Sequence, residues 1–343
     1  MYSGRTIGVV VPAYDEEEFV GEVIETVPEF VDRIYAVDDR STDGTWDEIN
    51  RHAARANGEV RATGSERGAI VANGGSALGR RVVPIRHAEN RGVGGAIKTG
   101  YRQALEDGID VAAVMAGDGQ MDPDHLPSLL DPIVDGEADY AKGNRLVNGD
   151  HRGGMPRFRL FGNALLTLLT KVASGYWRTM DPQNGYTAVS SRALEAVDVA
   201  SMYEDYGYPN DLLVRLNANE LRVADVAIPA VYGDEESTID YTTYVPKVSA
   251  LLVRTFAWRL ARRYPIGDAH PVPLFYAASA LAFGGGLLGA LRSLYRHRRR
   301  SDGRGLVELA ASTLLLVAGG AFFALASLLE RRVNDGLEVR RHG

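Results

Sequence analysis

The stretch VAAVMAGDGQMDPD, residues 111–124, decides how the rest of this sequence is interpreted. Its apolar start, 111–115, has the length and composition of a buried strand, and a Gly-flanked turn follows directly. The turn presents Asp118 and Gln120, whose side chains point the same way in an extended backbone because they are two residues apart. Such oxygen ligands suit Mg²⁺ or Mn²⁺. Taken alone, the stretch fits a surface turn rich in Asp and Gly at least as well.

Strand and helix signals alternate around this stretch, between residues 6 and 142. Apolar runs at 7–11, 34–37 and 82–85 precede predicted helices at 16–27, 46–56 and 94–105, and a helix at 126–134 follows the quoted stretch. Further along, helices are expected at 158–174 and from Pro209, and strands at 187–190 and 221–228. Unbroken apolar strands separated by helices indicate an α/β fold with a mostly parallel sheet covered on both faces.

Four polar loops follow the predicted strands, and ligands bind at the carboxyl ends of strands in such sheets. The loops are PAYDEEE (12–18), DDRSTDGT (38–45), ENRGVGGA (89–96) and GDGQMDP (117–123). We expect all four to converge on one edge of the sheet. In the second loop, Asp38 and Asp39 can accept hydrogen bonds from ribose hydroxyls or a base N–H. Asp43 and Thr45 are suited to capping the next helix.

The third loop combines glycines with positive charge. Its glycines would let the backbone approach a ligand, and the following helix offers N–H groups to anions, with Arg91 and Lys98 nearby. The pattern is neither GxGxxG nor a Walker loop, which disfavours dinucleotide and ATP chemistry. Lys142, Arg145, Arg157 and Arg159 lie within the range 142–159. Because an arginine fork donates two parallel hydrogen bonds, this cluster predicts a second, phosphate-binding site.

Composition limits the classes of function. The chain has 343 residues, a formal net charge of −7 and no cysteine, so nothing favours nucleic acid as a partner, and any metal must bind oxygen or His. No cleavable signal peptide is evident at the start, and the N-terminal part is expected in the cytoplasm. We expect a catalytic domain at 1–243 with an inserted loop at 57–79, a juxtamembrane segment at 244–268, two membrane helices within 269–331 and a tail at 332–343.

Two uncharged apolar stretches, 271–291 and 309–329, are each long enough to span a bilayer. A buried helical hairpin packed on the soluble domain is the alternative. Residues 244–264 interleave arginines with Trp and Phe, which suits a headgroup layer and an ordinary amphipathic helix equally well. A hairpin would place RHRRR (296–300) outside the cell, contrary to the positive-inside tendency.

Taken together, VVVPAYDEEE, VDDRSTDGT, NRGVGGAIKTGY, MAGDGQMDP, KGNR and DPQNGY resemble the family 2 glycosyltransferases of the GT-A fold. The resemblance is greatest to the dolichyl-phosphate and polyprenyl-phosphate mannose and glucose synthases of archaeal type, and covers residues 6 to about 265. It implies a GT-A type, Rossmann-like sheet and an inverting reaction. A hexose would pass from UDP-glucose or GDP-mannose to the phosphate of a membrane polyprenol, for cell-surface glycan or glycoprotein assembly.

The resemblance also implies roles for individual residues. The nucleotide sugar would be bound by Pro12, Ala13, Tyr14, Glu16, Asp38, Asp39, Arg91, Gly92, Lys98 and Asp118. Asp118 and Gln120 would bind the metal, and Arg145, Arg157 and Arg159 the acceptor phosphate, with Asp118, Arg145 and Arg159 catalytic. Two departures stand out. Ala116 replaces the first Asp of the family's frequent Asp-x-Asp, and YGDEESTI (232–239) lacks the Arg and later Lys of many relatives.

Two other interpretations stay open. The chain could transfer sugar to a hydroxyl of a polysaccharide or diacylglycerol, which needs a general base, with Asp181, Asp205 and Asp211 as candidates. A phosphomonoester needs no such base because its second pKa is near ~6. The chain could also be a membrane-anchored scaffold without turnover, which Ala116 favours and the other loops disfavour. Formation of a homo-oligomer is likewise left open.

Overall fold

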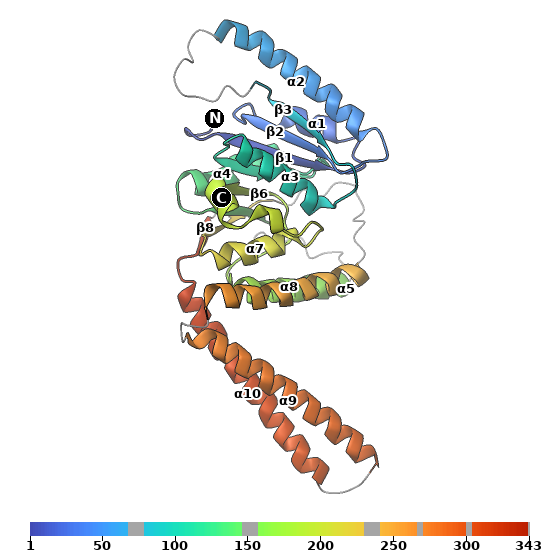
Figure 1. The fold of residues 1–343 in the computed structure, drawn as a ribbon, viewed down its shortest axis with the longest axis vertical. Coiled ribbons are helices and arrows are strands. Elements are labelled where there is room, and N and C mark those ends of the chain that lie inside the picture. Colours follow the sequence, from blue (N-terminus) through green and yellow to red (C-terminus); the bar gives the residue numbers. More distant parts are fainter. Residues whose placement is uncertain (68–78, 146–156, 230–240, 266–269, 300–303, 342–343) are drawn as a thin grey trace. The chain divides into compact units, whose positions relative to one another are not determined.

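The computed structural model describes residues 1–67, 79–145, 157–229, 241–265, 270–299 and 304–341 (Figure 1). The chain forms two compact units. The first comprises Met1–Phe256 together with Gly336–Gly343, and the second comprises Ala257–Asp335. The second unit is therefore inserted in the sequence of the first.

A mixed sheet organises the first unit. Its strands in the described chain are β1 (Ile7–Ala13), β2 (Arg33–Asp38), β3 (Val82–Arg86), β4 (Val111–Val114), β5 (Tyr140–Asn144), β6 (Thr187–Ser190), β7 (Val223–Ala227) and β8 (Glu338–Arg341). They lie in the order β3-β2-β1-β4-β6-β5-β7-β8. β1 and β4 are buried along their whole length, because a central parallel strand is covered on both faces.

The strand directions create one functional edge. β1 pairs in parallel with β2 and β4, and β2 with β3. β6 is antiparallel to both of its neighbours, β4 and β5, so these two run in the same direction. The carboxyl ends of β1 to β5 therefore meet at one edge of the sheet. This arrangement confirms the predicted α/β fold with a mostly parallel sheet.

Helices cover both faces of the sheet (Figure 1). On one face, a buried cluster joins β1 to α1 (Val20–Thr26), α2 (Thr45–Arg67) and α4 (Leu126–Val134), which follows the short helix η1 (Pro123–His125). On the other face, α3 (Val93–Glu106), α6 (Ser191–Ala196) and α7 (Tyr208–Ala218) contribute to a second cluster, near the short helix η3 (Val199–Ser201). A third cluster packs α5 (Arg157–Ser174) and the first part of α8 (Tyr241–Arg263) against α7.

Three segments differ from the expected pattern. The first helix begins at Val20 rather than at residue 16, because the backbone N–H groups of residues 15–17 donate to side chains of residues 41–45. α2 continues to Arg67, so residues 57–67 are helical rather than part of a loop, since Ala, Arg and Glu there favour helix despite the glycines. Residues 68–78 of that expected loop lie outside the described part. The C-terminal tail forms β8, an edge strand paired with β7.

The second unit contains two long apolar helices, α9 (Pro271–Arg299) and α10 (Arg304–Val333). Within them, Pro271–Arg296 and Gly305–Val333 are candidate membrane spans by length and composition. Many of their apolar side chains face outward, including Leu281 and Leu314, which are 78% and 70% exposed. A Cβ on Gly286 would lie 2.9 Å from the carbonyl oxygen of Ser312, so glycine permits the close approach of the two helices.

A buried ion pair ties this unit together. Arg259 of α8 lies 2.7 Å from Glu330 of α10, and both side chains are fully buried. Tyr276 of α9 donates a hydrogen bond of 2.8 Å to the same carboxylate. The three helices that enter this unit therefore share one buried polar contact.

Candidate active site

The first two polar loops are bound to each other at the edge where β1 and β2 end. The backbone N–H of Thr42 donates to Asp15 Oδ1 over 2.7 Å, and that of Gly44 to Glu17 Oε2 over 2.7 Å. In return, Glu16 N–H donates to Thr45 Oγ1 over 2.7 Å. These acids, expected to start a helix, instead hold two loops together. Pro12 and Ala13 are the last two residues of β1 and are buried, whereas the next residue, Tyr14, is exposed.

Asp38 and Asp39 are almost completely buried and contact the chain itself. Asp38 Oδ1 accepts the N–H of Ser41 over 2.9 Å, and Oδ2 lies 2.9 Å from Arg86 Nε. Asp39 Oδ1 is 2.6 Å from His87 Nδ1 and accepts the N–H of Arg91 over 2.9 Å. Both carboxylates thus connect the end of β2 to the loop after β3. Any contact with a nucleoside would come in addition to these bonds.

Glu204 is the main partner of the two cations in the third loop. Its Oε1 lies 2.6 Å from Arg91 Nη2 and 2.8 Å from Lys98 Nζ. The hydrogen bond from Lys98, followed by that from Arg91, holds the pKa of Glu204 below its ordinary value. Sequence reasoning missed this carboxylate. The only available signal was its place in YEDYGYPND (203–211), a polar loop before a helix.

The glycines of the third loop lie close to the backbone of residues 203–205. A Cβ on Gly92 would lie 2.6 Å from the carbonyl oxygen of Glu204, and one on Gly94 would lie 2.6 Å from that of Tyr203. Gly92 also has a φ of +79°, which favours glycine. The N–H of Gly95 donates to the Glu204 carbonyl over 2.9 Å. The loop therefore packs closely against residues 203–205 on the side where a Cβ would lie.

A pocket of about 560 Å³ lies between these two segments. Arg91 and Gly92 line it from one loop, Glu204 and Asp205 from the other, and Arg254 of α8 completes it. Asp211 also lines this pocket. Its Oδ2 accepts from Arg215 Nε and from the N–H of Tyr203, over 2.8 and 2.9 Å, while its buried Oδ1 has no hydrogen-bond partner among the described residues.

Asp118 and Gln120 occupy the turn after β4, as predicted. Asp118 is half-buried, Gln120 is exposed, and the N–H of Gln120 donates to Asp118 Oδ1 over 3.0 Å. Burial raises the pKa of Asp118 above its ordinary value. In the described part of the chain, acids and histidines form no group of three that could hold a metal ion. One carboxylate with a neighbouring amide fits a cation only if the substrate supplies most of its ligands.

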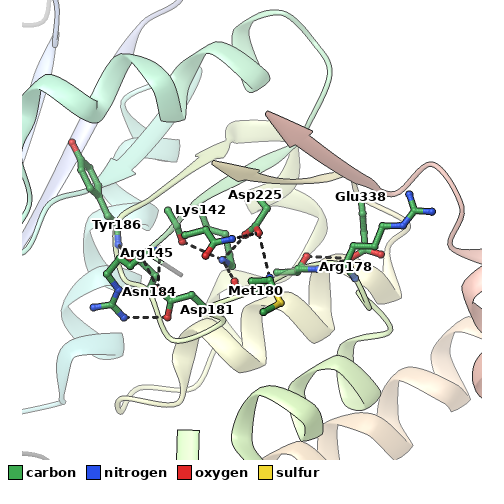
Figure 2. Close-up of polar contacts among 12 residues, drawn as sticks. Lys142, Arg145, Arg178, Met180, Asp181, Asn184, Tyr186, Asp225 and Glu338 are labelled. Atoms are coloured by element: carbon green, nitrogen blue, oxygen red, sulfur yellow. Dashed lines mark hydrogen bonds and ion pairs between the residues drawn. The ribbon is translucent and has the colours of Figure 1, made fainter. Parts of the chain in front are cut away.

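Arg145 directly follows β5 and meets Asp181 at the same edge of the sheet (Figure 2). Arg145 Nε donates to Asp181 Oδ2 over 2.8 Å, and Nη2 donates to Oδ1 over 3.1 Å. Burial acts to raise the pKa of Asp181, but the hydrogen bonds and charge of Arg145 outweigh it, and this pKa lies below its ordinary value. The Arg145 side chain is 43% exposed, so solvent and ligands can reach it.

Lys142 is not part of an anion site. Its side chain is 1% exposed and its Nζ lies 2.8 Å from Asp225 Oδ1. Asp225 Oδ2 in turn accepts from Asn144 Nδ2 over 2.6 Å. β5 is a buried strand in which Lys142 is paired with Asp225 of β7. The Lys142 side chain therefore points into the protein. The sequence cluster around Lys142 and Arg145 therefore divides into a structural lysine and an accessible arginine.

For the other residues expected in the acceptor site, the structure describes the backbone at most. Arg157 and Arg159 lie in the first turn of α5, and their side chains are outside the described part. The segment YGDEESTI (232–239) is outside it as well.

Backbone hydrogen bonds connect the loops along the rim. Asp39 N–H donates to Ala13 O over 2.9 Å, and Gly117 N–H donates to Pro12 O over 3.0 Å, which places the second and fourth loops on either side of β1. From there, Tyr186 Oη donates to Asp122 O over 2.9 Å. Gly143 N–H donates to Tyr186 O over 2.9 Å. The structure thus brings Asp39, Asp118 and Arg145 to a single edge of one sheet.

A chain with this sheet and these loops belongs to a known family. The family described as Glycosyl transferase family 2 matches residues 8–198, which is more than half of the 343 residues. The protein is therefore a member of glycosyltransferase family 2, with a fold of the GT-A type, and the predicted resemblance is confirmed.

Individual relatives are named for different sugars. The chain is 29% identical over 231 residues to the UDP-N-acetylglucosamine–dolichyl-phosphate N-acetylglucosaminyltransferase of Methanococcus voltae, covering 67% of this chain and 87% of that one. It is 28% identical over 260 residues to the undecaprenyl-phosphate mannosyltransferase of Micrococcus luteus, covering 74% and 94%. Among solved structures, glucosyl-3-phosphoglycerate synthase of Mycobacterium tuberculosis is 22% identical with a TM-score of 0.47, covering 75% and 80%.

Proposed function

We propose that this glycosyltransferase moves a hexose from a nucleotide-diphosphate sugar to the phosphate of a polyprenol such as dolichol, with inversion. The observation that carries the proposal is the presence of Asp118 and Arg145 at the same edge of one sheet, after β4 and β5. An acidic turn suits the donor's diphosphate through a cation, and an accessible arginine suits the acceptor's phosphate. The names of the two relatives, each for a polyprenyl-phosphate acceptor, support this assignment.

The donor would lie over the first four loops. Pro12, Ala13 and Tyr14 would contact the nucleoside, with Glu16, Asp38 and Asp39 holding the loops around it through the bonds described above. Arg91 and Lys98 would face the diphosphate, beside the pocket that Gly92 lines. To bind it, both cations would give up their contacts with Glu204. Asp118 and Gln120 would hold Mg²⁺ or Mn²⁺, which would offset the charge that develops on the leaving diphosphate. Because Ala116 supplies no carboxylate, the donor would have to supply most of that ion's ligands.

The acceptor phosphate would be bound by Arg145, together with Arg157 and Arg159. At neutral pH a phosphomonoester is largely a dianion, so its oxygen can attack the sugar carbon without a base. The site then has to place the phosphate and neutralise part of its charge. Arg145 can do both, because its fork already accommodates the two oxygens of Asp181. The phosphate would compete with Asp181 for this fork.

Transfer to a sugar or lipid hydroxyl is the second candidate. One observation favours it: Asp211 lines the pocket with a buried carboxylate oxygen that has no hydrogen-bond partner among the described residues. Such an oxygen could accept a proton from a hydroxyl group. Of the two other base candidates, Asp205 also lines the pocket, whereas Asp181 is engaged by Arg145 and has a lowered pKa, which makes it a poor base.

A lipid acceptor would require the protein to act at a cell membrane. We propose that α9 and α10 cross the bilayer, with the first unit in the cytoplasm and residues 296–300 on the far side. Since the natural chain has no cysteine, single variants Ser3→Cys and Ser301→Cys can be labelled with an impermeant maleimide in sealed vesicles. The proposal requires only one of the two to react before the vesicles are opened. Equal labelling of both in sealed vesicles would contradict it.

The function itself is tested with pairs of acceptors. The full chain is supplied with labelled UDP-glucose, GDP-mannose or UDP-N-acetylglucosamine, together with dolichyl phosphate or dolichol in vesicles. We expect one donor to label dolichyl phosphate, with a product cleaved by mild acid, and no product from dolichol. We assign the donor to UDP-glucose or GDP-mannose, and a preference for the N-acetylglucosamine donor would correct the sugar alone. Transfer to dolichol only, in an acid-stable linkage, would support the second candidate instead.

A further inference from the structure

Glu338, the first residue of β8, contacts the loop that carries Asp181. Its Oε1 accepts the N–H of Arg178 over 2.7 Å, the N–H of Thr179 over 2.9 Å and the hydroxyl of Thr179 over 3.2 Å (Figure 2). β8 itself is held in the sheet beside β7, where Glu338 is opposite Val223. A single carboxylate from the end of the chain thus orders two consecutive residues of a distant loop.

The next residue of that loop is fixed by the buried ion pair. The N–H of Met180 donates to Asp225 Oδ2 over 3.3 Å, and its carbonyl accepts a hydrogen bond from Lys142. Figure 2 shows the resulting row, which runs from Glu338 through Asp225 and Lys142 to Asp181 and Arg145. Residues 178, 179 and 180 are therefore held in succession by three side chains from β8, β7 and β5.

Asp181 depends on this arrangement. Its φ of +47° lies in the left-handed region, which is uncommon for residues other than glycine although aspartate tolerates it better than most. In this conformation its carboxylate reaches both nitrogens of the Arg145 fork. The direction of the Arg145 side chain is thus set by a loop whose other end is bound by Glu338.

From this geometry we infer that Glu338 is a positioning residue for the acceptor site, acting through residues 178–181 on Arg145. The inference rests on the proposed function, because it takes Arg145 as the group that binds the acceptor phosphate. In the sequence, β8 comes after the inserted unit Ala257–Asp335, which holds both candidate spans. The acceptor site would therefore be complete only when the chain has passed through the hairpin and returned to the sheet.

The same carboxylate could merely add stability to the sheet edge, and the two roles predict different kinetics. A positioning role affects the acceptor: a small displacement of a phosphate-binding arginine raises the KM for polyprenyl phosphate, lowers kcat, and leaves the KM for the donor unchanged. A purely structural role would lower the melting temperature and reduce the amount of active protein, with both KM values unchanged.

The test uses the full chain in detergent or vesicles, with Glu338→Ala, Glu338→Gln and the exposed control Glu195→Ala. We expect Glu338→Ala to lower kcat/KM for polyprenyl phosphate by about 10- to 100-fold with the donor KM unchanged. Glu338→Gln keeps an oxygen that accepts hydrogen bonds and should stay close to wild type, as should Glu195→Ala. If Glu338→Ala does not fold, Thr179→Val removes one of the three hydrogen bonds and should raise the acceptor KM by a smaller factor.

Two outcomes would overturn the inference. One is an unchanged acceptor KM in folded Glu338→Ala, or in Thr179→Val where the first variant fails to fold. The other is an equal change in the donor and acceptor KM values. Failure of the proposed function is distinguishable, because the wild-type chain would then transfer no sugar to polyprenyl phosphate. A wild type that is active on this acceptor, with Glu338→Ala indistinguishable from it, would remove only the role of Glu338.

Discussion

Arg145 Nε and Nη2 donate in parallel to the two carboxylate oxygens of Asp181, over 2.8 and 3.1 Å. A phosphate presents a pair of oxygens with a similar spacing, so the proposed acceptor phosphate would compete with Asp181 for the same donors. Asp181 thereby keeps the fork extended and aimed at the rim while no phosphate is bound. This contact connects the fold, which brings residues 145 and 181 together, to the reaction proposed for the protein.

The first prediction concerns the shape of this cation. Arg145→Lys keeps the charge but removes the fork, so we expect kcat/KM for polyprenyl phosphate to fall by about 10²-fold or more. Hydrolysis of the nucleotide sugar by water should change little, because it does not use the acceptor site. The control is Arg192→Ala, an arginine that is 74% exposed on its side chain. Steady-state kinetics with the donor at saturation give the answer, and an Arg145→Lys enzyme with wild-type acceptor kinetics would argue against phosphate binding there.

A second prediction addresses the acidic turn. Asp118→Ala should abolish transfer, because the only carboxylate that we assign to the cation is lost. Asp124→Asn, an exposed acid in the following turn, is the matched control and should retain activity. Both are measured as initial rates across a series of Mg²⁺ and Mn²⁺ concentrations. Activity near wild type in Asp118→Ala would refute the metal role.

The raised pKa of Asp118 leads to a third prediction, on pH dependence. Only the carboxylate form binds a cation, and burial moves its pKa upward, so activity should fall as the pH drops through a value above that of an ordinary aspartate. More Mg²⁺ favours the ionised form and should shift this acid limb to lower pH. The measurement is the pH profile of kcat/KM for the donor at two Mg²⁺ concentrations. An acid limb that does not move with Mg²⁺ would assign the titration to another group.

A fourth prediction separates structure from catalysis at β5. Lys142→Ala leaves Asp225 buried without its ion partner, which should cost about 3–5 kcal/mol of stability. The double variant Lys142→Met/Asp225→Asn removes both charges and should recover much of that loss. Thermal unfolding followed by circular dichroism compares the variants. Equal melting temperatures for wild type and Lys142→Ala would show that the pair does not stabilise the sheet.

Two neighbouring glycines provide the fifth prediction, on the hairpin. Gly286→Ala would place a Cβ 2.9 Å from Ser312 O, whereas a Cβ at Gly284 has nothing within 4 Å. We therefore expect Gly286→Ala to destabilise the α9–α10 pair by about 1–3 kcal/mol and Gly284→Ala to have little effect. Thermal unfolding in detergent distinguishes them. Identical behaviour of the two variants would mean that the helices do not pack through Gly286.

The sequence predicts the first half of the sheet well because its signals are local. The runs that form β1 and β4 are apolar throughout, as expected of strands buried on both faces, and the loops after them carry the polar motifs. The same local signals explain why Asp118 could be assigned to the predicted edge of the sheet. β5, which places Arg145 at the same edge, was not among the predicted strands.

Other features depend on contacts between distant residues and leave no local pattern. β8 has the sequence EVRR, which no apolar alternation marks as a strand, and it forms only because β7 offers a free edge. The role of Lys142 was misjudged because its partner Asp225 is 83 residues away. Likewise, the close packing of Gly92 and Gly94 against the backbone carbonyls of Glu204 and Tyr203 leaves no local pattern in the sequence.

The central claim is that the sugar becomes attached to a phosphate oxygen, and ³¹P NMR observes that atom directly. The purified full chain is incubated with Mg²⁺, a short polyprenyl phosphate and each nucleotide sugar in turn. With one of these donors, we predict that the phosphomonoester signal of the lipid disappears and that a phosphodiester signal of equal intensity replaces it. A phosphomonoester signal that persists unchanged, while sugar from the donor is transferred to a lipid or glycan hydroxyl, would contradict the account.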